Sequence, residues 1–265
     1  MSDRKQIPFE RGKNVLPAFL TPIGTFRVPD HESLNPALEA EILRRMQEDE
    51  GQTRSNVGGW HSMDNLFSWE PAAFKDLGEW IHSAAMNMVA VGSRTRRFRV
   101  KCQLSGWANV NGPGQYNGNH NHPGCSWSGV YYVRVEDTTD DPLPRAGHLQ
   151  FYDPRGSIEM IRHPGKSMFG HTITIRPQSG MLLVFPAWLY HSVNPFLSDV
   201  TRISIAFNAR LNDFETIEET DDDPVEVKVD IDDEGQLEPK NSGDGKKPAR
   251  SSQSAQQKTA KNSTK

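Results

Sequence analysis

The sequence predicts an α+β domain with a β-sandwich or jelly-roll core, and three observations lead to this fold class. Two segments early in the chain carry apolar residues at helical spacing. After Arg99 the pattern changes to short strand-like segments separated by turns rich in Gly, Pro and Asn. No apolar run approaches the ~20 residues that a membrane-spanning helix needs. Helices followed by many short strands are typical of a sheet core buttressed by helices on one face.

Each element has its own sequence evidence. Segment 16–28 is apolar but interrupted by prolines, which favours an edge strand. The first helix is expected over 36–48, because Leu38 and Ile42 lie on one apolar stripe. The second is expected over 71–91, where Phe74, Leu77 and Ile81 recur at helical spacing. The strands that we expect after the helices span 99–110, 128–135, 147–152, 172–175, 180–185 and 202–209.

The chain is long enough for one substantial domain with appendages. The acidic stretch 213–238 holds 13 acidic residues and one basic residue, whereas 239–265 holds seven basic residues and one acidic residue. The second stretch has almost no bulky apolar residues and cannot bury enough surface to fold alone. We therefore expect a flexible N-terminus (1–15), one domain (16–212, with its β core at 99–209), an acidic linker (213–238) and a disordered basic tail (239–265).

Composition and charge exclude several classes of protein. With 35% hydrophobic and 24% charged residues, the chain has the composition of an ordinary soluble protein. Two cysteines are too few for a disulfide scaffold, and the first residues lack an apolar signal segment, so a cytoplasmic location is expected. The body is nearly neutral and the tail has no aromatic residue for base stacking, which argues against nucleic acid as a partner. The sequence does not specify an oligomeric state.

Three histidines have the spacing of a metal site. His120 and His122 would project from the same face of a short strand that Pro123 ends, because side chains alternate along a strand. His191 follows the apolar strand expected around 181–185, which would carry it to the mouth of the core. Imidazoles suit iron, zinc, copper and nickel, and three of them leave coordination positions open for small ligands.

An arginine follows these histidines in an alternating strand. Arg202 and Ser204 face the same way in this strand, while Ile203 and Ile205 face the other way. A guanidinium forked onto a carboxylate is a strong anchor, and each such charge-assisted bond contributes roughly 1.5–3 kcal/mol. The pair would hold the distal carboxylate of a dicarboxylate bound near the metal.

These motifs together resemble a family of 2-oxoglutarate/Fe(II)-dependent oxygenases. The resemblance rests on His-x-His-Pro, Ser-Gly-Val-Tyr-Tyr-Val, Asp-Pro-Arg, Phe-Pro-x-Trp-Leu-x-His-x-Val-x-Pro and Arg-Ile-Ser-x-x-Phe-Asn between 107 and 208. It extends upstream to Asn-Val-Gly-Gly-Trp-His-Ser at 56–62, so it covers roughly 16–212. The family is similar in layout to prolyl hydroxylases, so the resemblance implies a double-stranded β-helix, a cupin-like jelly roll.

The resemblance also implies an activity, its cofactors and its site residues. The expected reaction is hydroxylation of an unidentified substrate, a small molecule or a peptidyl residue, with oxidative decarboxylation of 2-oxoglutarate. Fe(II) would lie at His120, His122 and His191; Arg202 and Ser204 would clamp the cosubstrate; Tyr132, Tyr131 and Asn109 would donate hydrogen bonds from the barrel wall. The expected residues of the pocket mouth are Trp60, His61, Trp107, Arg155 and Trp188.

The chain departs from the wider superfamily at one ligand. His122 stands where Asp or Glu is usual, and Asp153 is the second choice for a carboxylate ligand. Two other functions stay open at this stage. One is a cupin-like three-histidine metalloprotein that does not use 2-oxoglutarate, and the other is a non-catalytic jelly-roll module with a binding or structural role.

Overall fold

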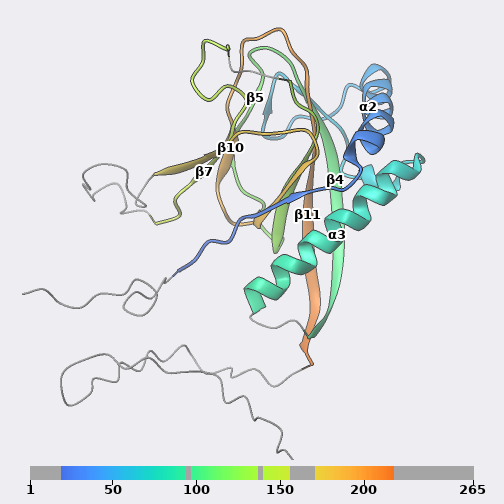
Figure 1. Ribbon diagram of the computed structural model, residues 1–265, viewed down its shortest axis with the longest axis vertical. Coiled ribbons are helices and arrows are strands. Elements are labelled where there is room, and N and C mark those ends of the chain that lie inside the picture. The colour runs from blue at the N-terminus through green and yellow to red at the C-terminus, as the bar shows by residue number, and fades with distance from the viewer. Residues whose placement is uncertain (1–18, 94–96, 137–139, 156–170, 218–265) are drawn as a thin grey trace, which may run out of the picture. The chain divides into compact units, whose positions relative to one another are not determined.

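A computed structural model describes residues 19–93, 97–136, 140–155 and 171–217 (Figure 1). Two long helices and two antiparallel sheets form this part of the chain. The helices are α2 (His31–Glu48) and α3 (Ala72–Ser93), and a short 3-10 helix, η1, spans Leu66–Ser68. None of the helices described here is both long and apolar enough to cross a membrane. The described part thus agrees with an α+β class whose core is β-rich.

The strands form one sheet of six and one of five. The larger sheet has the order β1-β9-β6-β11-β4-β3 and the smaller one β2-β5-β10-β7-β8. The strands are β1 (Gly24–Arg27), β2 (Asn56–Val57), β3 (Trp60–His61), β4 (Phe98–Asn111), β5 (Tyr116–His120), β6 (Trp127–Arg134), β7 (Leu149–Tyr152), β8 (Thr172–Ile175), β9 (Met181–Pro186), β10 (His191–Val193) and β11 (Arg202–Thr216). From β4 onward the chain therefore passes repeatedly from one sheet to the other.

The first helix begins at His31, five residues before the expected start at residue 36. Asp30 takes a left-handed conformation with φ 50°, and Ser33 donates its hydroxyl to the Asp30 carbonyl, so the helix begins at His31. Pro36 therefore lies inside the helix, where its lack of an amide proton removes one backbone hydrogen bond. Burial of Leu38 and Ile42 against the sheet stabilises the helix despite this loss.

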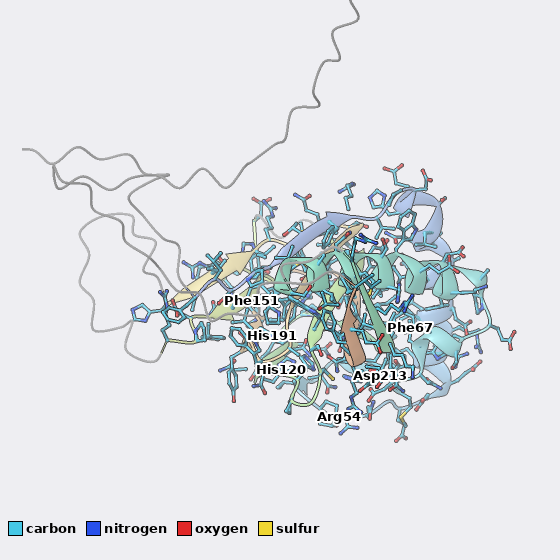
Figure 2. The ribbon with its side chains drawn as sticks, turned by 90° about the horizontal axis from the view of Figure 1, so that it is seen from below. Arg54, Phe67, His120, Phe151, His191 and Asp213 are labelled. Carbon is cyan, nitrogen blue, oxygen red and sulfur yellow. The ribbon has the colours of Figure 1, made fainter. Side chains whose placement is uncertain are left out.

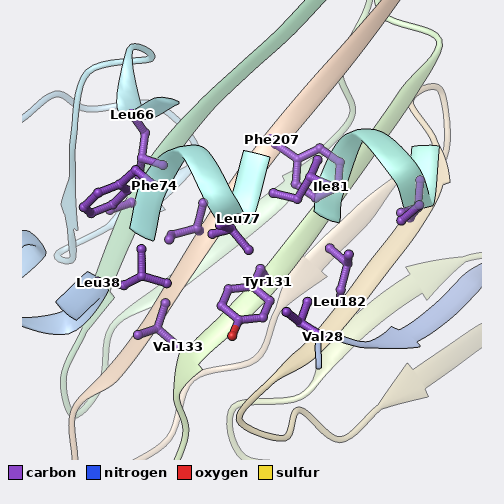
Figure 3. Close-up of a cluster of buried hydrophobic side chains, with 14 of the residues drawn as sticks. Val28, Leu38, Leu66, Phe74, Leu77, Ile81, Tyr131, Val133, Leu182 and Phe207 are labelled. Atoms are coloured by element: carbon purple, nitrogen blue, oxygen red, sulfur yellow. The ribbon is translucent and has the colours of Figure 1, made fainter. Parts of the chain in front are cut away.

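The main hydrophobic core lies between the helices and the larger sheet. Figure 3 shows Leu77 and Ile81 of α3 facing Tyr131 and Phe207, which project from β6 and β11. A second, smaller cluster includes Tyr132 together with Phe151 and Phe185. Because neighbouring residues on a strand face opposite ways, Tyr131 and Tyr132 belong to different clusters. Strand β6 thus has one face toward the helices and one toward the interior between the sheets.

Two expectations about the chain's organisation need comment. β11 continues to Thr216, so the start of the acidic linker expected at 213–238 is strand. Lys101 of β4 pairs with Asp213 at 2.6 Å, which explains how an acidic residue joins the sheet. The remainder of that linker from 218, the N-terminus 1–15 and the basic tail 239–265 lie outside the described residues. Both cysteines are free thiols.

Candidate metal centre and the pockets beside it

His120 and His191 come together because two strands of the smaller sheet pair side by side. His120 is the last residue of β5 and His191 the first of β10, and the two are direct partners in the antiparallel register. Figure 2 labels both residues in the same region of the domain. His191 follows the strand expected around 181–185, and a turn between β9 and β10 carries the chain to the other sheet before this residue.

His122 reaches the same place by a different route from the one expected. It does not share a strand face with His120, because β5 ends at His120. Its backbone amide donates to the Ala187 carbonyl at 2.8 Å, which holds the loop after β5 against the turn after β9. Gly124, with φ 82°, then turns the chain back toward β6. The tertiary contact, and not strand alternation, positions this imidazole.

The three side chains form a compact donor set. One ligand atom from each of His120, His122 and His191 lies within 4.8 Å of the others. Nε2 of His122 is 3.4 Å from Nε2 of His191, and the ring centroids of His120 and His191 are 4.3 Å apart. No other group of three potential metal ligands occurs in the described part of the chain. Three imidazoles suit Fe(II) among other divalent ions.

Backbone carbonyls fix the tautomers of two of these histidines. Nδ1 of His120 lies 2.7 Å from the Gly118 carbonyl, and Nδ1 of His191 lies 2.9 Å from the Leu189 carbonyl. Since a carbonyl oxygen only accepts, each Nδ1 carries the proton and each Nε2 keeps a lone pair that a metal can use. Burial lowers the pKa of His122 to about 4 and that of His191 to about 3. The imidazoles are therefore neutral near pH 7, which is the form that binds metal.

Asp153, the second choice for a ligand, lies outside this donor set. Its carboxylate pairs with the Arg155 guanidinium at 2.6 Å and also accepts the Arg155 backbone amide. The Arg155 hydrogen bond is the main cause that lowers the pKa of Asp153. The turn after β7 thus uses this carboxylate locally, and the described cluster consists of neutral histidines alone.

A narrow pocket of about 40 Å³ adjoins the histidines and contains Arg202. Its apolar walls include Val130, Leu149 and Phe185. Arg202 is only 5% exposed, and its Nε and Nη1 atoms have no hydrogen-bond partner among the described residues. No described carboxylate forms an ion pair with it. Burial of a guanidinium with two unpaired nitrogens costs several kcal/mol, so the pocket suits an anion.

The side chains around Arg202 match that charge. Ser204, Tyr132 and Asn109 line the same pocket, and the Tyr132 hydroxyl and the Asn109 Oδ1 are also buried without a partner. The Arg202 guanidinium lies 5.3 Å from the centre of the Tyr132 ring. Burial lowers the pKa of Arg202 and raises that of Tyr132. The unused Tyr132 hydroxyl is a donor beside a buried cation and fits a bound carboxylate such as one end of 2-oxoglutarate, whereas the Asn109 Oδ1 is an acceptor and gives such a carboxylate no hydrogen bond.

Tyr131 is not part of this pocket, so its expected role toward the cosubstrate is wrong. Its side chain faces the helices and donates its hydroxyl to Asn35 Oδ1 of α2 at 2.5 Å. Asn35 in turn donates to the Val133 carbonyl at 2.7 Å. The strand alternation that brings Tyr132 into the pocket turns Tyr131 away from it.

A wider hollow of about 600 Å³ is lined by two of the histidines, His120 and His122. It shares Ser55, Trp107, His120 and His122 with the narrow pocket, so the two meet at the donor set. The lining of the hollow consists of Arg54, Ser55, His61, Asp64, Trp107, Gly118, Asn119, His120, Asn121, His122 and Asn208.

Two of the five residues expected at the pocket mouth line this hollow, namely His61 and Trp107. Trp60 instead donates its indole N–H to the Asp49 carbonyl, and Arg155 is engaged with Asp153. Trp188 is half exposed on the turn after β9, and neither pocket includes it. The choice of aromatic and basic residues near the motifs therefore predicted only part of the lining of the hollow.

Sequence reasoning missed several residues of the site. Ser55 lies 3.3 Å from Nε2 of His120 and also receives a hydrogen bond from Asn117. Its irregular segment carries no periodic signal that could have indicated this. Asn208 could have been found, because the alternation that places Arg202 and Ser204 on one face continues to it.

Comparison with known proteins agrees with this site. Residues 105–208 match the family described as "Putative 2OG-Fe(II) oxygenase". No curated protein matches the chain significantly. A Trichoplax adhaerens prolyl hydroxylase, solved with a peptide fragment of hypoxia inducible factor, is 14% identical with a TM-score of 0.51, and the match covers 71% of this chain and 83% of that one. A Pseudomonas putida prolyl-4-hydroxylase is 18% identical with a TM-score of 0.49, over 71% and 91% of the two chains.

The described site and the family match support a 2OG-Fe(II) oxygenase, which confirms the resemblance expected from the sequence. Fe(II) and 2-oxoglutarate are the metal and the cosubstrate that the family match and the three-histidine site support. The Trichoplax structure adds similarity of fold.

Proposed function

We propose that the protein is an Fe(II)/2-oxoglutarate-dependent dioxygenase that hydroxylates a C–H bond of its substrate. The observation that carries this proposal is the buried, unpaired Arg202 in a narrow pocket that also contains the three histidines. A cation desolvated in this way destabilises the folded protein unless an anion pairs with it, and a metalloprotein without a dicarboxylate cosubstrate does not supply that anion. A dicarboxylate spanning the pocket would offset that cost.

In this proposal each side chain has one task. His120, His122 and His191 would hold Fe(II) through their Nε2 atoms, and Arg202 with Ser204 would hold the far carboxylate of 2-oxoglutarate. Tyr132 would add a hydrogen bond there. When bound, the iron and 2-oxoglutarate supply the activation of dioxygen, with 2-oxoglutarate converted to succinate and carbon dioxide.

The protein contributes orientation and exclusion of water. The carbonyls of Gly118 and Leu189 hold two imidazoles with Nε2 toward the metal, so little reorganisation accompanies binding. The apolar side chains Val130, Leu149 and Phe185 would flank the methylene groups of the cosubstrate and keep water away from the reacting centre. The substrate would approach from the wide hollow, because this space adjoins His120 and His122.

We further propose that the strands from β4 to β11 form a double-stranded β-helix. In support, β4, β6, β9 and β11 lie in one sheet, while β5, β7, β8 and β10 lie in the other. Eight strands distributed between two facing sheets are typical of a jelly roll. The oxygenase domain expected at 16–212 would then continue to the end of β11 at Thr216.

A cupin-like enzyme that does not use 2-oxoglutarate is the second candidate. The donor set favours it, because no described carboxylate joins the three histidines. The unpaired guanidinium of Arg202 weighs against it, since such an enzyme would act on its substrate directly with dioxygen and would need no dicarboxylate anchor.

Anaerobic titration of the Fe(II)-loaded protein with 2-oxoglutarate separates these candidates. If the protein is an Fe(II)/2-oxoglutarate-dependent dioxygenase, we expect a visible charge-transfer band whose intensity saturates at one equivalent of 2-oxoglutarate. Arg202→Ala should weaken this binding by roughly 100-fold, as expected for about two charge-assisted hydrogen bonds. A control, Arg99→Ala, changes an exposed arginine of β4 and should leave the titration unchanged. Iron binding without any response to 2-oxoglutarate would favour the cupin-like alternative.

A further inference from the structure

The wide hollow differs in chemistry from the narrow pocket that it adjoins. Among the residues that the structure describes, no aliphatic side chain lines the hollow, and Trp107 is the one lining residue with a largely apolar side chain. The narrow pocket, in contrast, has Val130, Leu149 and Phe185 in its walls. An apolar ligand in the hollow would strip water from polar groups without replacing their hydrogen bonds, which costs free energy. The lining therefore favours a hydrophilic ligand.

His61 offers a hydrogen-bond acceptor to this hollow. Its Nδ1 lies 2.6 Å from the Ser62 carbonyl, so Nδ1 carries the proton and Nε2 has the free lone pair. The side chain is 3% exposed, and its ring stacks on Trp107 with centroids 5.4 Å apart and an interplanar angle of 10°. No described group uses the Nε2 atom as an acceptor. The ring is therefore held in place with its acceptor unused.

Asn208 offers a second unused acceptor. Its Oδ1 is buried and has no hydrogen-bond partner in the described chain. Asn208 lies on the same face of β11 as Arg202 and Ser204, but it lines the wide hollow and not the narrow pocket. The same face of β11 thus contributes the cation Arg202 to the narrow pocket and the neutral acceptor Asn208 to the wide hollow.

Two charged residues complete the lining. Asp64 accepts a hydrogen bond from the Gln52 side chain at 3.1 Å, which leaves most of its acceptor capacity free. Arg54 is exposed and also lines the hollow. A carboxylate near two neutral acceptors suits an ammonium group as well as hydroxyl groups, while one arginine keeps the lining electrically balanced.

We propose that the wide hollow binds a hydrophilic substrate through its N–H or O–H donors, with His61 and Asn208 as the acceptors that orient it beside the metal. This inference rests on the proposed function, because it names the substrate class of the same centre. The donors come either from hydroxyl groups, as in a sugar or polyol, or from an ammonium group. Asp64 would add to the binding of the ammonium form.

The test uses probes and needs no knowledge of the natural substrate. The protein is loaded with Mn(II) and 2-oxoglutarate, and the proton relaxation of D-glucose, D-glucosamine and cyclohexanol is measured by NMR at equal concentrations. A probe that occupies the hollow lies close to the paramagnetic ion and relaxes faster. The two sugars should show stronger enhancement than cyclohexanol, which has a six-membered ring of similar size with a single hydroxyl.

Variants assign the effect to the two acceptors. His61→Phe keeps a ring that can stack on Trp107 but removes Nε2, and Asn208→Leu removes the amide. Each should reduce the enhancement of the sugars about fivefold, as expected for loss of one hydrogen bond. The control Asn212→Leu makes the same change on the exposed part of β11 and should have no effect. If Asn208→Leu does not fold, Asn208→Ala takes its place.

The outcomes distinguish the two donor sources and the two proposals. Asp64→Asn should weaken the binding of D-glucosamine more than that of D-glucose if the hollow recognises the ammonium group. It should weaken the binding of both sugars equally if the hollow recognises hydroxyl groups. Equal or greater enhancement of cyclohexanol, absence of any sugar enhancement, or unchanged enhancement in both acceptor variants would overturn the inference. Saturation-transfer measurements on the metal-free protein repeat the comparison without the ion. If the metal-free protein binds the sugars but the iron-loaded protein does not respond to 2-oxoglutarate, the inference that the hollow binds a hydrophilic ligand stands. The proposed oxygenase function is then wrong.

Discussion

His191, the first residue of β10, lies directly opposite His120, the last residue of β5, in the antiparallel pairing of the two strands. Two ligands distant in the chain thus share a site because of strand register. A slip of one residue would turn one imidazole to the opposite face of the sheet. The register of a short strand pair therefore determines whether the metal centre exists.

The first prediction concerns these two ligands. His120→Ala and His191→Ala should each abolish stoichiometric iron binding, because two remaining imidazoles hold a divalent ion weakly. Iron content after anaerobic reconstitution and desalting measures this. His82→Ala, which changes an exposed histidine of α3, is the control and should retain full iron content. Full iron content in both cluster variants would show that the metal is bound elsewhere.

Two neighbouring tyrosines should give opposite phenotypes. Tyr132→Phe should weaken 2-oxoglutarate binding about fivefold through loss of one hydrogen bond, with little effect on folding. Tyr131→Phe should leave 2-oxoglutarate binding unchanged. It should lower the free energy of unfolding by about 1–3 kcal/mol, because Asn35 Oδ1 loses its buried partner. Urea denaturation and 2-oxoglutarate titration of both variants check the prediction, and equal effects of both substitutions on binding would contradict it.

The third prediction is a gain of stability at the cost of function. Without cosubstrate, the unpaired guanidinium of Arg202 is a desolvated charge. Arg202→Met should raise the free energy of unfolding of the cofactor-free protein by about 1–3 kcal/mol. Wild-type protein should gain about 2.7 kcal/mol from 2-oxoglutarate at 100 times its dissociation constant, and the variant, with binding weakened roughly 100-fold, should gain about 0.4 kcal/mol at the same concentration. Thermal or urea unfolding with and without 2-oxoglutarate tests this, and a less stable cofactor-free variant would speak against an unpaired cation.

Gly129 in the Ser-Gly-Val-Tyr-Tyr-Val motif should not tolerate a side chain. A Cβ there would lie 2.2 Å from the Phe207 ring and 2.3 Å from the Leu183 carbonyl. Gly129→Ala should therefore destabilise the protein by about 3 kcal/mol or more, since the backbone or core must shift. Gly112→Ala is the control, because its Cβ would meet its nearest atom at 3.7 Å. Chemical denaturation measures the free energy of unfolding of both variants. Similar values for Gly129→Ala and Gly112→Ala would contradict the prediction.

The fifth prediction concerns pH and the surface of α2. Hydrogen bonds from Arg44 are the main cause that lowers the pKa of Glu41 from 4.5 to about 2, with Arg45 adding to the effect. Because the folded pKa is lowered, this stabilisation is fully present above pH 4.5 and is lost as the pH falls toward 2. Glu41→Gln should cost about 0.5–1 kcal/mol at pH 7. Denaturation curves at several pH values should converge with wild type in acid, and a constant difference would contradict the assignment.

The alternation of strand residues could be predicted from the sequence, and it explains much of the site. Arg202 and Ser204 share a face in the structure as expected, and both line the narrow pocket. The same rule requires that Tyr131 and Tyr132 point in opposite directions. It does not say which of the two faces the pocket, because that depends on which face of β6 the helices cover.

By itself, the sequence determined the α+β class, the motifs and the identity of the three imidazoles, because these follow from local periodicity and residue chemistry. Only the tertiary structure decided how they meet. His122 reaches the cluster through an amide bond to Ala187, and Ser55 lies beside His120 through pairing of β2 with β5. Such contacts join segments far apart in the chain, and their geometry depends on the register of the strands and the packing of the core. No local pattern encodes that geometry.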